Sequence, residues 1–179
     1  MGILKKLRWP LVVASLVLSF GLLLGGSALV RHLRVDSPLH AAMTQDPAVL
    51  GYSVDNAGTE PVLHVRLGPV PDLAETYQRI DSTARRTLGS GPYRIQLEDR
   101  RTPALASAYH RIHFALQEGL QRGTYDTMEQ RVEAETAGLG LSSHRLTVSD
   151  GRIYVQLSQG SDYLYAVLER PQVQGGEGS

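Results

Sequence analysis

Cysteine is absent from the 179-residue chain, and lysine occurs only at Lys5 and Lys6. Without cysteine the protein has no thiol nucleophile, no thiolate zinc site and no disulfide. Because both lysines lie near the first residue, the remainder lacks a lysine for a Schiff base, a Ser–Lys dyad or a phosphate-binding loop. Several enzyme mechanisms are therefore excluded from most of the chain.

Asparagine is also scarce, since Asn56 is the only one, and every basic residue after position 35 is arginine. Such a composition is typical of a GC-rich bacterial genome. Residues 1–35 hold five of the 18 basic residues and none of the 18 acidic ones, which leaves 13 basic against 18 acidic residues, a formal net charge of −5. Nucleic-acid binding relies on Lys and Arg to replace counterions along the phosphates, so we expect no nucleic-acid partner.

Charged side chains are missing from residues 9–30, a stretch of 22 positions. A helix needs about 20 apolar residues to cross the hydrocarbon core of a bilayer. The stretch therefore predicts a single transmembrane signal anchor. The alternative is a signal peptide cleaved near Ala28, but the apolar region of a signal peptide usually has only about 7–15 residues.

The basic head, residues 1–8, carries Lys5, Lys6 and Arg8, against Arg31 and Arg34 after the span. Basic residues near a span favour the cytoplasmic side. We therefore expect the head in the cytoplasm, the anchor in the bacterial cytoplasmic membrane and the rest of the chain outside. The expected parts are a juxtamembrane segment over 31–48 with a short helix at 39–45, one extracytoplasmic domain over 49–170 and a disordered tail over 171–179.

The spacing of apolar residues and of helix-capping residues predicts three helices and six strands in the domain. Asp72 with Glu75 and Thr102 with Pro103 mark two helix starts. The predicted order is β-β-α-β-α-α-β-β-β, with strands at 50–55, 62–67, 93–98, 146–149, 152–157 and 163–169, and helices at 73–88, from 103 to about 120 and from 126 to about 137. This order predicts an α+β fold, a two-layer sandwich with helices on one face of an antiparallel or mixed sheet.

Asp150-Gly151 lies between two strand-like runs and is typical of a two-residue type I′ hairpin turn. Pairing Ser149 with Arg152 places all the core residues of both strands on one face. With a further turn at 158–161, the outer face carries two rows of residues. One row is Thr147, Tyr154 and Tyr165, and the other is Arg145, Gln156 and Tyr163.

Three tyrosines of those rows, Tyr154, Tyr163 and Tyr165, form the candidate partner-binding surface, because tyrosine is enriched where proteins meet. The structural alternative is that tyrosine favours strands and stabilises sheets through cross-strand contacts. If the rows face solvent, truncating Tyr154 and Tyr165 together should cost only about 1 kcal/mol of stability or less.

His110 and His113 are three residues apart on one helix and are weak candidates for metal ligands. No further histidine or cluster of carboxylates stands at a metal-binding spacing nearby. We therefore expect two partly exposed polar side chains, no bound metal and no cofactor.

Arg100 and Arg101 precede Thr102, the predicted N-cap, and two guanidinium groups beside a helix N-terminus are a weak candidate anion site. The neighbouring Glu98 and Asp99 could neutralise both arginines within the chain. Elsewhere the charges indicate helix-supporting pairs four residues apart, each contributing about 0.2–0.5 kcal/mol. These pairs are Glu75–Arg79, Asp81–Arg85 and Glu118–Arg122.

Taken together, these patterns favour a membrane-anchored domain that binds or assembles with another protein of the bacterial cell envelope and is not an enzyme. One alternative is an envelope enzyme or metal-dependent protein that uses His110 and His113 with acidic partners. Another is a sensor of an anion or small ligand. No nucleophile elbow and no Gly-rich phosphate loop occurs in the sequence to favour a particular reaction.

Overall fold

The computed structural model describes residues 37–89 and 91–170. The predicted basic head, the predicted span 9–30 with the alternative cleavage near Ala28, and the predicted tail lie outside these residues. Among the residues described, no helix combines the length and the apolar character that crossing a bilayer requires.

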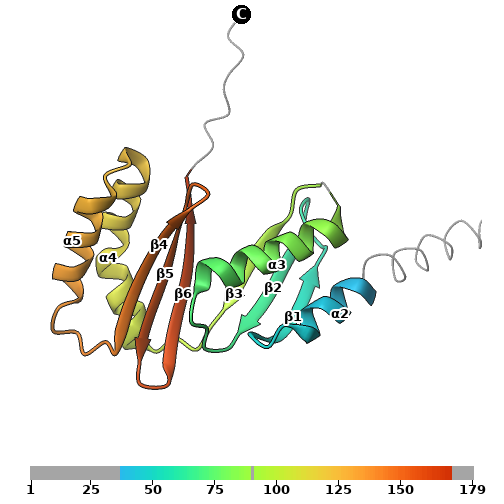
Figure 1. Ribbon diagram of the computed structural model, residues 1–179, viewed down its shortest axis with the longest axis horizontal. Coiled ribbons are helices and arrows are strands. Elements are labelled where there is room, and N and C mark those ends of the chain that lie inside the picture. The colour runs from blue at the N-terminus through green and yellow to red at the C-terminus, as the bar shows by residue number, and fades with distance from the viewer. Residues whose placement is uncertain (1–36, 90, 171–179) are drawn as a thin grey trace, which may run out of the picture.

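The described chain is an α+β fold with four helices and two three-stranded sheets (Figure 1). The predicted class is confirmed, but the prediction of one sheet is wrong. The elements are α2 (Ser37–Gln45), β1 (Val49–Asp55), β2 (Val62–Leu67), α3 (Leu73–Leu88), β3 (Arg94–Glu98), α4 (Pro103–Arg122), α5 (Tyr125–Thr136), β4 (Ser143–Ser149), β5 (Arg152–Gln159) and β6 (Asp162–Glu169).

The first unit contains α2, α3 and a mixed sheet of order β1-β2-β3. β2 is antiparallel to β1. It is parallel to β3, as expected for two strands that a helical crossover joins. In β2, Leu63, Val65 and Leu67 are fully buried, whereas Arg66 on the opposite face is exposed. This alternation is typical of a sheet with one face on a core and the other in water.

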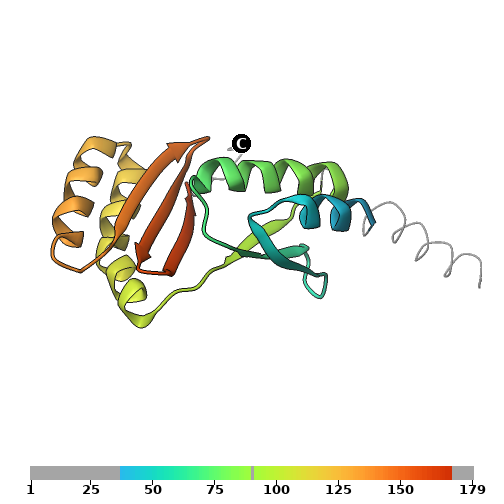
Figure 2. The ribbon, with the colours of Figure 1, turned by 60° about the horizontal axis from the view of Figure 1, so that its bottom comes forward.

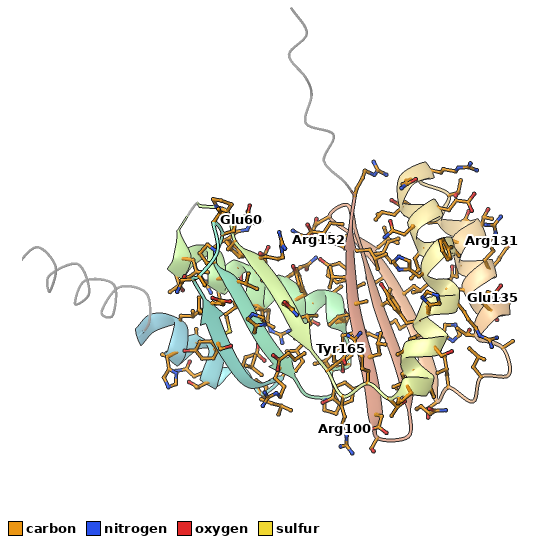
Figure 3. The ribbon with its side chains drawn as sticks, turned by 180° about the vertical axis from the view of Figure 1, so that it is seen from behind. Glu60, Arg100, Arg131, Glu135, Arg152 and Tyr165 are labelled. Carbon is orange, nitrogen blue, oxygen red and sulfur yellow. The ribbon has the colours of Figure 1, made fainter. Side chains whose placement is uncertain are left out.

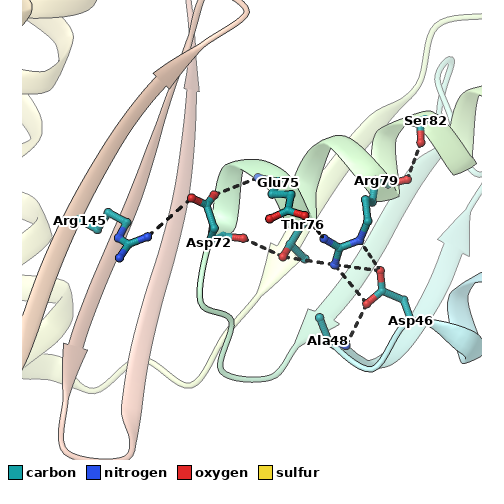
Figure 4. Close-up of polar contacts among 8 residues, drawn as sticks. All are labelled: Asp46, Ala48, Asp72, Glu75, Thr76, Arg79, Ser82 and Arg145. Carbon is teal, nitrogen blue, oxygen red and sulfur yellow. Dashed lines mark hydrogen bonds and ion pairs between the residues drawn. The ribbon is translucent and has the colours of Figure 1, made fainter.

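The predicted start of α3 is confirmed, because an Asp72 carboxylate oxygen accepts a hydrogen bond from the Glu75 backbone N–H at 3.0 Å. The same carboxylate lies 3.7 Å from the Arg145 guanidinium on β4, and Arg79 of α3 pairs with Asp46 at 3.3 Å (Figure 4). Asp72 therefore caps a helix of the first unit and contacts a strand of the second.

The second unit is an antiparallel meander, β4-β5-β6, with α4 and α5 on one face. Thr102 caps α4 as predicted, its hydroxyl accepting from the Leu105 backbone N–H at 3.2 Å. Gly119 of α4 lies against Met128 of α5, so closely that a Cβ added to the glycine would sit 2.7 Å from that side chain. The absent side chain allows the two helices to approach.

The predicted β4–β5 hairpin is confirmed: Asp150 and Gly151 have φ of 52° and 72°, and Ser149 pairs with Arg152. The predicted position of β6 is correct to within one residue, but its predicted pairing with β5 is wrong by two residues. Gly160, with φ of 63°, allows a two-residue turn instead of the four-residue turn at 158–161. Tyr165 consequently pairs with Gln156, and the neighbour of Tyr154 on β6 is Val167.

The second sheet forms a layer between its own helices and the first unit (Figures 1 and 2). The prediction that Tyr154, Tyr163 and Tyr165 face solvent is therefore wrong, because they are only 1%, 8% and 4% exposed and belong to the core of the first unit. The Tyr163 and Tyr165 hydroxyls donate to the carbonyls of Leu67 (2.9 Å) and Gly68 (3.1 Å).

The linker from β3 to α4 explains why the strands do not form one sheet. It meets β6 in a single antiparallel bridge, between Arg100 and Tyr163, where the Tyr163 backbone N–H donates to the Arg100 carbonyl at 3.2 Å. Tyr165 continues along this edge by donating its backbone N–H to the Asp99 carboxylate at 2.7 Å. A side chain thus replaces the strand backbone at this point, so the single bridge does not extend into a ladder between β3 and β6.

Candidate functional site

The tyrosine surface predicted to bind a partner is the joint between the two units. The Val70 backbone N–H donates to the Tyr165 hydroxyl at 3.0 Å, while Gln156 accepts from the Leu73 N–H at 2.8 Å and donates to the Val70 carbonyl at 3.1 Å. In this structure those side chains contact the other half of the same chain. An external partner has no access to them.

Arg100 and Arg101, the candidate anion-binding residues, are both paired with carboxylates of the chain. Arg101 makes two hydrogen bonds of 2.8 Å to Asp99, whose side chain is 2% exposed, and Arg100 lies 2.9 Å from Asp162. The hydrogen bond to Asp99 raises the pKa of Arg101. This arrangement fastens the linker to β6 and does not favour an anion site.

His110 and His113 do not converge on a common ligand position with other metal-binding groups. His110 is exposed on α4, and the His113 ring nitrogen Nδ1 lies 3.3 Å from the Tyr109 hydroxyl. Within residues 37–89 and 91–170 no cluster of three or more His, Asp or Glu side chains could hold a metal ion. The geometry gives the metal hypothesis no support.

A cleft with a volume of about 680 Å³ lies between the two units in the described part of the chain. Its walls come from α3, β3 and the ends of β5 and β6, and Figure 3 shows Glu60 and Arg152 on either side of it. Three acidic and three basic side chains line it: Glu60, Asp81 and Glu169, with Arg85, Arg94 and Arg152.

Asp81 is the centre of the polar network in this cleft. Its carboxylate accepts a short hydrogen bond from the Tyr93 hydroxyl and lies 3.4 Å from Arg85 and 3.9 Å from Arg152. Burial, with the hydrogen bond and charge of Asp81, raises the pKa of Tyr93 to about 12. Of these contacts the sequence predicted only the Asp81–Arg85 pair, whose residues are four apart on one helix. Tyr93 and Arg152 lie much farther along the chain from Asp81, where no helical or strand spacing indicates a contact.

Arg152 connects this network to the core of the joint. It lies 2.6 Å from Glu169, and its guanidinium sits 5.5 Å from the centre of the Tyr77 ring. Burial alone would lower the pKa of Arg152, but the hydrogen bond and charge of Glu169 outweigh it and the pKa is raised. The charges of the cleft are thus largely matched by one another.

The Tyr154 hydroxyl is buried beside Arg152 and has no hydrogen-bond partner among the described residues. Burial raises its pKa, although the Arg152 guanidinium acts in the opposite direction. The Tyr154 ring packs edge-on against Tyr77, with centroids 5.6 Å apart. An unpaired buried hydroxyl costs stability, so Tyr154 stabilises the joint through the packing of its ring.

The second unit also has an open sheet edge, formed by β4. In the described chain β4 pairs with β5 alone, and its seven residues include exposed His144, Arg145 and Val148. Val148 is 40% exposed, one of only three large hydrophobic side chains that the described surface exposes to this degree. Sheet edges of this kind can accept an additional strand.

The outer edge of the first sheet is different. β1 is interrupted by an irregularity between Val49 and Gly51, and α2 packs beside it. Bulges twist an edge away from further pairing. Of the two outer edges, β4 is therefore the regular one.

No family model matches this chain, and comparisons with curated proteins and with solved structures found no significant match.

Proposed function

We propose that this chain is a single-pass membrane protein of the bacterial cell envelope whose extracytoplasmic domain binds another protein through the open edge of β4. The observation that carries the proposal is this edge: seven residues of regular strand, paired on one side only, with an exposed valine. An extended segment can add to such an edge through backbone hydrogen bonds, with alternate side chains giving specificity.

The cleft supports binding or structural roles better than catalysis. Its carboxylates Asp81 and Glu169 are held by arginine and tyrosine side chains from both units, an arrangement that stabilises the joint. Its volume of about 680 Å³ also falls in the range of small-molecule sites, which favours a ligand-sensing domain as the second candidate.

Site-specific photo-crosslinking in membranes tests the binding role. A photoreactive residue at Val148 should give protein adducts, whereas the same residue at Gln96, exposed on β3, should not. Equal labelling from both positions, or none from Val148, would contradict the proposal. A small ligand that raises the melting temperature without affecting the adducts would favour the cleft instead.

The topology has its own test. The proposed span at 9–30 and the basic head favour a domain outside the membrane, so alkaline phosphatase fused after residue 170 should be active and sediment with membranes. A released mature chain that begins near Leu29 would show that the apolar stretch is a cleaved signal instead.

A further inference from the structure

The free hydrogen-bonding groups of β4 follow from its hairpin register. A two-residue turn closes with a hydrogen bond from the Arg152 N–H to the Ser149 carbonyl, so these residues form a hydrogen-bonded pair. Because such pairs alternate along an antiparallel ladder, Arg145 and Thr147 also direct their backbone groups toward β5. The N–H and C=O groups of His144, Leu146 and Val148 point to the open edge.

We infer that the partner at this edge is β4 of a second copy of the chain, running antiparallel about a two-fold axis at Thr147. The inference rests on the proposed function and names its partner. The pairing joins two three-stranded sheets into one continuous sheet, and it uses the same patch on both copies, as a two-fold interface requires.

Side-chain matching selects this register. It places Leu146 of each copy opposite Val148 of the other, which covers the exposed valine, and Thr147 opposite Thr147. Moving the axis to Val148 would oppose Leu146 to Asp150, and moving it to Arg145 would oppose two arginines. With the axis at Leu146, the apolar pairs become Leu146 with Leu146 and Val148 with polar His144.

Charge agrees with the register centred on Thr147. In this register Arg145 of one copy lies opposite Ser149 of the other, so no like charges meet across the two β4 strands. On the other face, Leu146 packs partly against the core formed with α4 and α5, and the apolar pairs extend that core across the axis.

Membrane geometry is compatible with the same symmetry. The two-fold axis of antiparallel edge pairing is perpendicular to the sheet, so each face of the sheet lies on the same side in both copies. The first unit, which includes helix α2, packs on the face of the second sheet that carries Tyr154, Tyr163 and Tyr165. Helix α2 of both copies therefore lies on one side of the joined sheet, where one membrane can hold both predicted anchors.

Thr147→Cys in the full-length chain tests the register directly, because the protein has no cysteine of its own. Residues opposite one another in a non-hydrogen-bonded pair have Cα atoms about 4.5 Å apart, within the range of about 4.4–6.8 Å that a disulfide spans. The matched control is Arg145→Cys, whose two copies would lie about 14 Å apart. Under mild oxidation in membranes, T147C should give about tenfold more disulfide-linked dimer than R145C.

A second substitution shows whether the edge itself is used. Adding Val148→Lys to T147C places a charge against Leu146 of the other copy and should remove most of the dimer, whereas Val148→Thr should retain it. Both changes replace an exposed side chain, so circular dichroism should show a folded domain in each case.

The outcomes separate this inference from the proposed function. Equal dimer yields from T147C and R145C would indicate random collision and overturn the inference. If T147C gives no dimer while the photoreactive residue at Val148 labels a different protein, the binding role stands and the second copy is excluded. If neither experiment gives a product, both proposals fail.

Discussion

The two sheets of this protein differ in how their faces are covered. In the first sheet Leu63, Val65 and Leu67 of β2 are buried, while the opposite face carries exposed Arg66. In the second sheet three consecutive residues of β5, Ile153, Tyr154 and Val155, are all buried. The first sheet is thus the outer layer of one unit, and the second is a central layer that serves two cores.

The second sheet shows how tyrosine, an aromatic ring with a polar hydroxyl group, can fill the space between two packed layers. The rings of Tyr163 and Tyr165 lie 5.1 Å apart in the core of the first unit. Their hydroxyls donate to the carbonyls of Leu67, the last residue of β2, and of Gly68, the residue after it. An outward polar row and an inward tyrosine row look alike in the sequence, because tyrosine satisfies either environment.

The largest effect should follow from emptying the central layer. Tyr154→Ala combined with Tyr165→Ala should cost more than about 4 kcal/mol of unfolding free energy, because buried aromatic truncations cost about 3–5 kcal/mol each and neighbours need not add. Thermal or denaturant unfolding of the full-length chain in detergent measures the loss. A cost near 1 kcal/mol would show that the tyrosines face solvent after all.

A smaller but clear effect should come from the helix pair that covers only the second sheet. Gly119→Ala should cost about 1–3 kcal/mol, because the new methyl group would overlap Met128 of the adjacent helix. Gly51→Ala in β1 is the matched control, since no atom lies within 4 Å of the added Cβ. Equal melting temperatures for the two variants would refute the close approach of α4 and α5.

The cleft between the units should make stability depend on alkaline pH. The folded-state pKa of Tyr93 is raised from about 10 to about 12, so the unfolded chain ionises first. Stability is then fully present below pH 10 and falls as the pH rises toward 12. Tyr93→Phe should flatten that fall and remove a hydrogen bond worth about 1 kcal/mol at neutral pH. An unchanged slope in denaturant titrations from pH 9 to 12 would contradict the assignment.

The smallest effect belongs to the exposed face of the first sheet. Arg66 and Glu98 form an ion pair at 3.2 Å with side chains 63% and 43% exposed. Arg66→Ala should change the unfolding free energy by no more than about 0.5 kcal/mol, because solvent screens such pairs. A loss comparable to that of the tyrosine variant would remove the contrast between the two sheets.

Local features were predictable from the sequence because each acts within a few residues. The caps at Asp72 and Thr102 and the Asp150-Gly151 turn were confirmed with the expected hydrogen bonds or φ values. The turn before β6 differs from the predicted one at 158–161, because Gly160 forms a two-residue turn that shifts the register by two residues. The α+β class followed from these local elements.

The joint and the cleft were not predictable in the same way. Tyr163 meets the Leu67 carbonyl across 96 residues of sequence, and Gln78 meets Asp150 across 72. No periodicity relates positions so far apart in the sequence. For the same reason the contact between Arg152 and Asp81 could not be predicted. The division into two sheets depends on the same long-range contacts, since within residues 37–89 and 91–170 the backbones of the two sheet edges meet only at the bridge between Arg100 and Tyr163.

The tyrosines that β5 and β6 contribute to the core of the first unit also constrain the order in which the chain can fold during synthesis. A ribosome delivers α2, β1, β2, α3 and β3 well before β5 and β6, yet the core of the first unit contains Tyr154, Tyr163 and Tyr165 from those last strands. The half made first therefore waits with an open apolar surface until the half made last arrives. The last strand, β6, then closes both cores together, because Tyr163 and Tyr165 enter one core and Leu164 and Leu168 enter the other.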